Sequence, residues 1–96
     1  MFNTALIGAG YIAQNHIDAF ARLPNAQISA LICRSRERGE DAARRIGPHC
    51  RWYPSLEEAL AGRALQIVDI CTPSDLHERY TLEAAQAGCH VLCEKP

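Results

Sequence analysis

The chain has 96 residues, of which 48% are hydrophobic and 22% are charged, and its formal net charge is -1. These values are typical of a single globular domain, and they give no reason to expect nucleic acid or an anionic membrane as a partner. No apolar run is long enough to cross a bilayer, and no secretory signal is visible. We therefore expect a cytoplasmic domain.

The cysteine pattern also points to the cytoplasm. The five cysteines are odd in number and contain no C-x-x-C pair, so they predict neither a disulfide framework nor a metal site. We interpret them as reduced and mostly buried thiols. They are Cys33, Cys50, Cys71, Cys89 and Cys93.

Short apolar runs alternate with segments of helical periodicity along the chain. The apolar runs predict strands over residues 4–7, 28–33, 51–53, 67–71 and 90–93. Helices are expected from residue 12 to Pro24, over 40–46, from Ser55 to Gly62 and from Asp75 to Gly88. With right-handed crossovers, this alternation predicts an α/β fold, a doubly wound parallel sheet of the Rossmann type with strand order 3-2-1-4-5.

Several residues carry signals for the ends and faces of these helices. Ser55 with Glu58, and Asp75 with Glu78, have the spacing of capping boxes. Gly88 is expected to cap the last helix in a left-handed conformation. The core-facing side of the first helix is expected to include Ile12, Ala13, Ile17, Phe20 and Ala21.

The segment from Gly8 to Ala13 reads G-x-G-x-x-A and lies between the first strand and the first helix. In this motif Gly8 permits a tight turn and Gly10 lets the backbone approach a pyrophosphate. The N–H groups of Tyr11 and Ile12 at the helix start then bind the phosphates. The alternative, a plain strand-to-helix turn, leaves both glycines unexplained.

The end of the second strand indicates which dinucleotide is bound. About 20 residues after the glycine loop, an NAD site usually has an acid that binds the ribose hydroxyls. This chain has Cys33 followed by Arg34, Ser35 and Arg36. Two guanidinium groups and a hydroxyl suit a 2'-phosphate, so we predict that NADP is preferred, with NAD as the alternative cofactor. Ordinary solvated arginines are the competing interpretation.

The loop after the fourth strand is expected at the same edge of the sheet. Pro73 is expected to hold Thr72 extended at the cofactor site. Thr72 and Ser74 are predicted to offer a hydroxyl and backbone groups to the diphosphate or the nicotinamide ribose. Capping of the next helix is the competing role for Ser74 and Asp75. His77 is a further candidate for cofactor binding, although a histidine in a first helical turn is commonly only solvated.

The assembled pattern resembles the N-terminal NAD(P)-binding domain of the Gfo/Idh/MocA oxidoreductases, the family of glucose-fructose oxidoreductase and inositol dehydrogenase. The residues that carry the resemblance are Gly8 to Ala13 with His16, Thr72-Pro73 with His77, and Ala87 to the closing Glu94-Lys95-Pro96. The resemblance implies that Lys95 is the catalytic residue, reaching the nicotinamide and the substrate hydroxyl, and that Glu94 and Lys95 contribute to cofactor binding. His16 itself is interpreted as a packing residue.

The same resemblance implies a hydride transfer between the nicotinamide and a sugar, polyol or related small-molecule substrate. It also implies a second domain that holds the substrate and mediates homo-oligomerisation, which residues 1–96 do not include. We therefore expect a fragment or trimmed domain that is inactive alone. The alternatives are a non-catalytic NAD(P)-binding sensor and an S-adenosylmethionine-dependent methyltransferase, which shares a glycine loop.

Overall fold

The computed structural model describes residues 1–93, apart from the side chain of Ser74. Its strands are β1 (Phe2–Ile7), β2 (Ala26–Ile32), β3 (Arg51–Tyr53), β4 (Ile67–Ile70) and β5 (His90–Cys93). Its helices are α1 (Tyr11–Phe20), α2 (Arg36–Ile46), α3 (Leu56–Gly62) and α4 (His77–Gln86), and the short 3-10 helix η1 (Ser74–Leu76) precedes α4.

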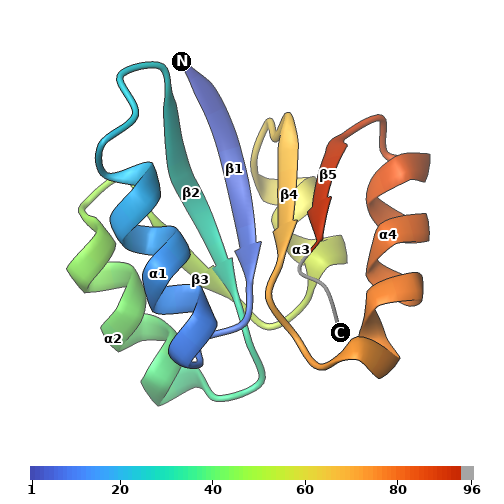
Figure 1. Cartoon of the computed structure of the whole chain (residues 1–96), viewed down its shortest axis with the longest axis horizontal. Coiled ribbons are helices and arrows are strands. Elements are labelled where there is room, and N and C mark those ends of the chain that lie inside the picture. The colour runs from blue at the N-terminus through green and yellow to red at the C-terminus, as the bar shows by residue number, and fades with distance from the viewer. Residues whose placement is uncertain (94–96) are drawn as a thin grey trace.

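The strands form one parallel sheet in the order β3-β2-β1-β4-β5, which confirms the predicted topology. Helices α1 and α2 cover one face of the sheet, and α3 and α4 cover the other (Figure 1). Because every strand pairing in the sheet is parallel, all strands run in the same direction and their carboxyl ends meet at one edge. The chain leaves β1 toward α1 and β4 toward η1 at this edge.

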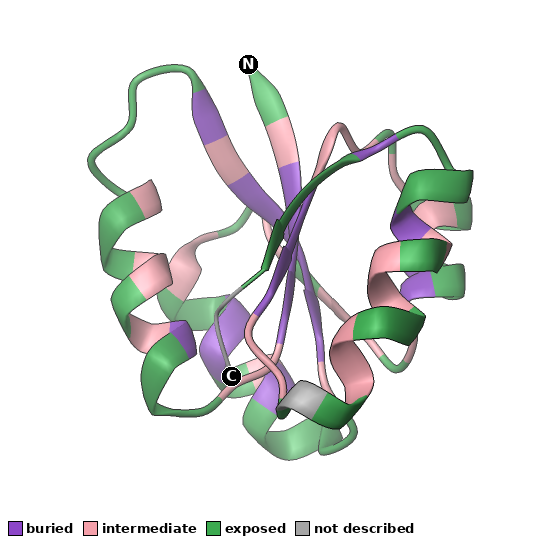
Figure 2. Ribbon diagram, turned by 45° about the vertical axis from the view of Figure 1, so that its right-hand side comes forward, coloured by how far each residue is buried: buried purple, intermediate pink, exposed green. Residues whose placement is uncertain are grey.

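The core consists of two apolar layers, one on each face of the sheet. Leu6 and Leu31 pack with Ala13 of α1 on one face, and Ile7 and Val68 pack with Leu56 of α3 and Ala84 of α4 on the other. Because β1 and β2 are buried on both faces, their sequences are continuous apolar runs rather than alternating ones (Figure 2). The edge strand β5 is exposed at all its positions.

Helix α2 begins four residues earlier than the sequence predicted. Ser35 is its N-cap, and the Ser35 hydroxyl accepts a hydrogen bond from the Arg38 N–H at 3.2 Å. The first turn is rich in charge and lacks the apolar periodicity by which the sequence analysis placed the start at Glu40. A capping side chain therefore determines this boundary.

Two further expectations about helices were wrong. The second capping box does not form, because η1 leads directly into α4, whose N-cap is Leu76 without a side-chain hydrogen bond. In α1, Ile12 and Ala21 are exposed, while Ala13 is buried. The other signals were confirmed, since Ser55 accepts from the Glu58 N–H at 3.2 Å and Gly88 has a φ of +81°.

The prediction that the cysteines are mostly buried was also wrong. Only Cys89 is buried, Cys93 is exposed, and the other three are intermediate. Burial raises the pKa of Cys50 to about 12, an effect that the nearby Arg63 charge partly opposes, and burial also raises the pKa of Cys89. Both thiols therefore stay protonated, and weakly reactive, at neutral pH.

Within residues 1–93, no helix has the length and apolar character needed to span a membrane.

Gly39 shows how closely α2 packs on β3. A Cβ atom at this position would lie 2.0 Å from Cδ1 of Trp52 and 2.8 Å from Sγ of Cys33. We expect Gly39→Ala to lower the free energy of unfolding by about 2 kcal/mol, because the cost of overpacking exceeds the gain in helix propensity. Urea titration measures the change. The matched control is Gly10→Ala, where a Cβ meets nothing within 4 Å; equal midpoints for both variants would contradict the packing argument.

Candidate functional site

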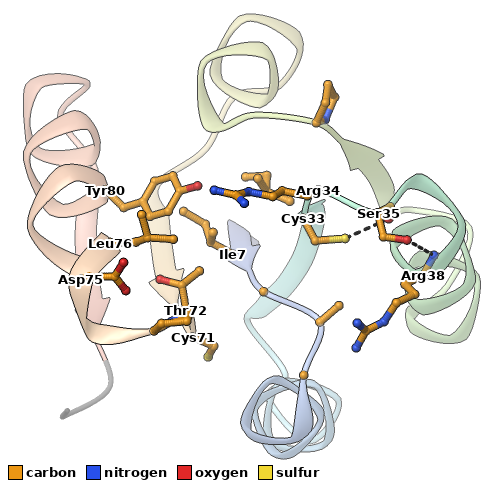
Figure 3. Close-up of a pocket in the computed structure, with 16 residues that line it drawn as sticks. Ile7, Cys33, Arg34, Ser35, Arg38, Cys71, Thr72, Asp75, Leu76 and Tyr80 are labelled. Atoms are coloured by element: carbon orange, nitrogen blue, oxygen red, sulfur yellow. Dashed lines mark hydrogen bonds between the residues drawn. The ribbon is translucent and has the colours of Figure 1, made fainter.

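A cavity of about 560 Å³ opens at the carboxyl edge of the sheet (Figure 3). The glycine loop after β1, the loop after β2 and the loop after β4 line it, together with Tyr80 of α4. The edge is also where the strand order reverses, because β2 and β4 lie on opposite sides of β1. Open parallel sheets bind their ligands at such a point.

The glycine loop has the geometry that the sequence predicted. Gly8 has a φ of +118°, and a Cβ there would lie 2.8 Å from the carbonyl oxygen of Cys71, so only glycine lets the loop pass this close to the end of β4. Its N–H donates to the Ile32 carbonyl at 2.8 Å, which fixes the loop to β2.

Gly10 leaves the start of α1 open to a ligand. It is the N-cap residue, no side chain caps the first-turn amides, and a Cβ at Gly10 would meet nothing within 4 Å. An uncapped helix start with adjacent empty space fits a diphosphate, which the amides and the helix dipole stabilise. The side chains of Tyr11 and Ile12 are exposed and do not line the cavity, so only their backbone groups can serve it.

The loop after β4 offers a second polar contact. Thr72 and Pro73 line the cavity, and the Thr72 hydroxyl is buried without a hydrogen-bond partner among the described residues. A buried hydroxyl without a partner is costly, so its position beside the cavity also fits a bound polar ligand. The backbone of Ser74 begins η1.

His77 supports this loop rather than lining the cavity. Its Nε2 lies 2.6 Å from the carbonyl oxygen of Thr72. Because a carbonyl only accepts hydrogen bonds, Nε2 carries the proton and donates it. The contact holds Thr72 against the first turn of α4, and it gives His77 a positioning role that the sequence analysis did not consider.

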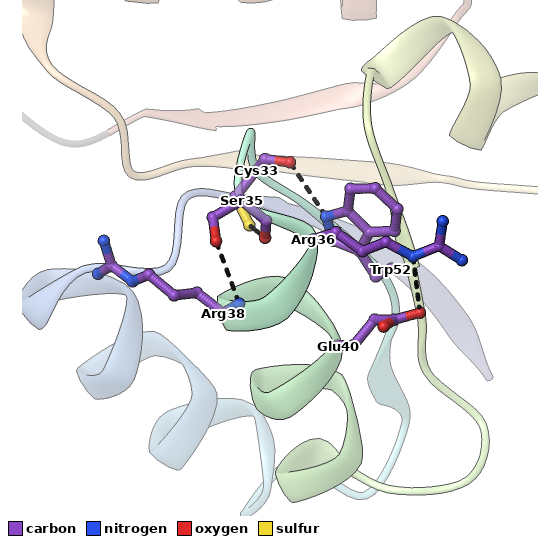
Figure 4. Close-up of polar contacts among 6 residues, drawn as sticks. All are labelled: Cys33, Ser35, Arg36, Arg38, Glu40 and Trp52. Atoms are coloured by element: carbon purple, nitrogen blue, oxygen red, sulfur yellow. Dashed lines mark hydrogen bonds and ion pairs between the residues drawn. The ribbon is translucent and has the colours of Figure 1, made fainter.

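The loop after β2 contributes Cys33, Arg34, Ser35 and Arg38 to the cavity, but not Arg36. Arg36 lies over the Trp52 ring, 5.5 Å from its centroid, and its Nε is 3.3 Å from Glu40 (Figure 4). The structure therefore contradicts the expectation that Arg36 lines the cofactor site.

The early start of α2 explains this correction. Residues two positions apart in a helix point about 200° apart, so Arg36 and Arg38 face opposite sides. The sequence analysis missed Arg38 because it placed the helix start at Glu40. Had Ser35 been recognised as the N-cap, the same helical geometry would have indicated Arg38.

Glu94 and Lys95, which the resemblance assigns to the cofactor and the reaction, lie outside the described residues.

Beside the cavity, three side chains from separate segments meet on the α1 face of the sheet. Nδ1 of His16 donates to Oδ2 of Asp69 at 2.5 Å, and Sγ of Cys71 lies 3.7 Å from Oδ1 of the same carboxylate. Asp69 is fully buried and His16 is 17% exposed. His16 therefore packs as the sequence analysis expected, with a partner that lies 53 positions away.

These three groups lie within 4.8 Å of one another, close enough to suggest a metal site. The distance between His16 and Asp69 argues against this interpretation. Two ligands of a tetrahedral zinc ion lie roughly 3.3 Å apart, given metal–ligand bonds near 2.0 to 2.1 Å. At 2.5 Å, the two atoms share a proton rather than a metal ion.

A parallel doubly wound sheet with a glycine loop at its switch point defines a dinucleotide-binding Rossmann domain. The family model described as "Oxidoreductase family, NAD-binding Rossmann fold" matches residues 2–96. The chain therefore belongs to the Gfo/Idh/MocA family and is a nicotinamide dinucleotide-binding domain. The family match also excludes the methyltransferase alternative.

Similar proteins are named dehydrogenases. The chain is 39% identical over 90 residues to inositol 2-dehydrogenase of Leifsonia xyli subsp. xyli, covering 93% of the chain and 26% of that protein. It is 34% identical over 97 residues to scyllo-inositol 2-dehydrogenase (NADP(+)) IolU of Bacillus subtilis, covering 100% of the chain and 29% of that protein. The chain thus spans less than a third of the length of these relatives.

A solved structure agrees with the fold. The WlbA dehydrogenase of Bordetella pertussis, crystallised in complex with NADH and UDP-GlcNAcA, matches with a TM-score of 0.90 at 33% identity. The match covers 99% of this chain and 29% of that one.

Proposed function

We propose that this chain is the cofactor domain of an NADP-preferring dehydrogenase that acts on a hydroxyl or carbonyl group of a sugar or polyol. The observation that carries the cofactor preference is the end of β2, where Arg34, Ser35 and Arg38 line the cavity and no acid is present. The substrate class is supported by the names of the relatives, which include inositol 2-dehydrogenase. The name of one relative also includes NADP.

The chain's own residues divide the work of binding the cofactor. The amides after Gly10 hold the diphosphate, and the Thr72 hydroxyl donates to the diphosphate or to the adjoining ribose. The Ser35 hydroxyl already accepts from the Arg38 N–H, so its own proton remains to donate to a 2'-phosphate. When bound, the nicotinamide would supply the acceptor or donor for hydride transfer. Lys95 orients the substrate oxygen and helps to transfer its proton.

A second domain completes the substrate site and forms the contacts of a homo-oligomer. This part of the proposal is supported by the short span of the match, which covers 26% of the inositol dehydrogenase relative. The odd number of cysteines and the lack of a C-x-x-C pair support a cytoplasmic location. The competing function is that of an NAD(P)-binding sensor without catalysis. Lys95 favours the enzyme, because a sensor has no need of an ammonium group at the reacting atoms.

Cofactor preference tests the proposal directly. We expect NADPH to bind on the order of 10 to 100 times more tightly than NADH at moderate ionic strength. One charge-assisted hydrogen bond to a phosphate contributes roughly 1.5 to 3 kcal/mol, and each tenfold in affinity corresponds to about 1.4 kcal/mol. Screening by salt and the ordering of exposed arginines reduce the total. Calorimetric titration of both cofactors at two salt concentrations measures the preference.

The arginines provide a matched set of variants. Arg34→Ala and Arg38→Ala, combined, should reduce the preference to about threefold or less, whereas Arg36→Ala should leave it intact because this side chain lies over Trp52. Tighter binding of NADH by the unaltered chain would refute the NADP preference. If Arg36→Ala alone removes the preference for NADPH, then Arg36 binds the 2'-phosphate in place of Arg34 and Arg38.

A further inference from the structure

The first turn of α1, which the proposed function assigns to the diphosphate, has little support of its own. Its N-cap is Gly10, which has no side chain, and the hydrogen bond from the Gln14 N–H to the Gly10 carbonyl is 3.3 Å long. Helices α2 and α3, by contrast, begin at Ser35 and Ser55, whose hydroxyls accept from first-turn amides. A helix start that leaves its amides to a ligand must be held by contacts further along the helix.

The apolar contacts of α1 hold it over β1 and β2. Ala13, Ile17 and Phe20 belong to the core cluster that contains Leu6 of β1 and Leu31 of β2. Such contacts have no preferred direction, so by themselves they leave the helix free to turn or slide slightly on the sheet. Strand β4, which leads to the other wall of the cofactor site, lies on the far side of β1 from β2.

The carboxylate of Asp69 connects α1 to the end of β4. Its Oδ2 accepts from Nδ1 of His16 at 2.5 Å, and its Oδ1 lies 3.7 Å from Sγ of Cys71. The glycine loop passes β4 at Cys71, because a Cβ at Gly8 would lie 2.8 Å from the Cys71 carbonyl oxygen. The carboxylate therefore contacts both the helix that presents the amides and the strand end that leads to Thr72.

Stability alone does not account for a polar pair at this position. Asp69 is fully buried, and His16 is 17% exposed. Replacing a buried charged pair with apolar side chains of similar volume is often neutral or stabilising, because the cost of desolvation offsets the attraction. A hydrogen bond has a preferred distance and angle, so it fixes how α1 lies relative to β4 in a way that apolar contacts do not.

We propose that His16 is a positioning residue for cofactor binding. Its hydrogen bond to Asp69 sets α1 against the end of β4, so that the amides after Gly10 and the Thr72 hydroxyl converge on the diphosphate. His16 does not line the cavity, so it acts through α1 rather than by touching the dinucleotide. The inference rests on the proposed function, because it assumes that the diphosphate lies at these amides.

Calorimetric titration of NADPH into the full-length protein that contains this chain tests the role. His16→Leu should weaken binding about tenfold, which corresponds to the loss of one charge-assisted hydrogen bond to a phosphate. His16→Asn should bind within about threefold of the unaltered protein, because its amide nitrogen lies close to the position of Nδ1 and also donates. His90→Leu, at an exposed histidine where β5 begins, is the control and should leave the affinity unchanged.

Two further measurements separate positioning from stability. His16→Leu with Asp69→Leu should melt at a higher temperature than His16→Leu alone but should not regain affinity for NADPH, because two apolar side chains fill the space without a directional contact. Adenosine 2'-phosphate has no diphosphate, and its proposed contacts lie at Ser35 and Arg38. Its dissociation constant should therefore differ by about twofold at most between His16→Leu and the unaltered protein, well below the tenfold change expected for NADPH.

The outcomes distinguish this inference from the proposed function. If the unaltered protein does not bind NADPH, the proposed function itself fails. If NADPH binds but His16→Asn is as weak as His16→Leu, the donated hydrogen bond does not position α1 and the inference is wrong. Full affinity in the double variant, or equal losses for NADPH and adenosine 2'-phosphate, would show that His16 contributes only to the packing of the domain.

Discussion

Lys95→Ala in the full-length protein that contains this chain is expected to lower turnover by a factor on the order of 10² to 10⁴, the usual effect of losing an acid–base group. The physical reason is that the proposed ammonium group donates to the substrate oxygen and moves its proton while hydride is transferred. Removing it leaves most of the proposed cofactor contacts in place, namely the amides after Gly10, the Thr72 hydroxyl and the loop after β2, so the dissociation constant of NADPH should change by about twofold at most.

Steady-state rates with inositols and aldoses, alongside calorimetric titration of NADPH, measure both effects. Lys95→Arg is the informative companion variant. It keeps the positive charge but replaces a compact ammonium with a planar guanidinium that stays protonated, so it should not restore turnover. Near-normal turnover of Lys95→Ala would show that this lysine does not take part in the reaction, and the sensor alternative would gain support.

His16→Leu is expected to lower the free energy of unfolding by about 2 to 3 kcal/mol. The substitution removes a hydrogen-bond donor from a carboxylate that is fully buried between neighbouring strands, in register with Leu6 and Leu92. Breaking a buried charged pair by removing one partner costs roughly 3 to 5 kcal/mol. We expect the lower value because His16 is 17% exposed and Asp69 has a further interaction besides this pair.

A double variant separates the loss of the pair from the loss of packing. His16→Leu with Asp69→Leu also removes the buried carboxylate that has lost its histidine partner, so it should be at least about 1 kcal/mol more stable than His16→Leu alone. His90→Leu, at an exposed histidine, is the control and should change stability by less than about 0.5 kcal/mol. Urea titrations provide all the values. If the double variant is less stable than the single one, the buried carboxylate is not the source of the cost.

Much of the fold could be predicted because its signals are local. The strands that became β3 and β5 have the predicted bounds, since short runs between turn residues mark them. The right-handed crossover then determines the order of the strands without any knowledge of contacts. The loop from Gly8 to Gly10 was predictable for the same reason, because its glycines are required by the backbone path and by the space that a ligand needs.

The direction of side chains at the site was not predictable from local signals. Arg36 and Arg38 have the same side chain and lie two positions apart. Only the N-cap of α2 at Ser35 decides which of them lines the cavity. Asp75 has the spacing of a cap, but the 3-10 turn of η1 carries it into the cavity wall instead.

The sequence by itself determined the α/β fold class, the strand order and the phosphate loop, because backbone sterics and periodicity act over a few residues. The tertiary structure decided which groups meet. His16 and Asp69 are 53 positions apart, and only the packing of α1 against β4 brings them to 2.5 Å. Such pairs depend on the register of the sheet and the rotation of each helix, and neither property is contained in any short stretch of sequence.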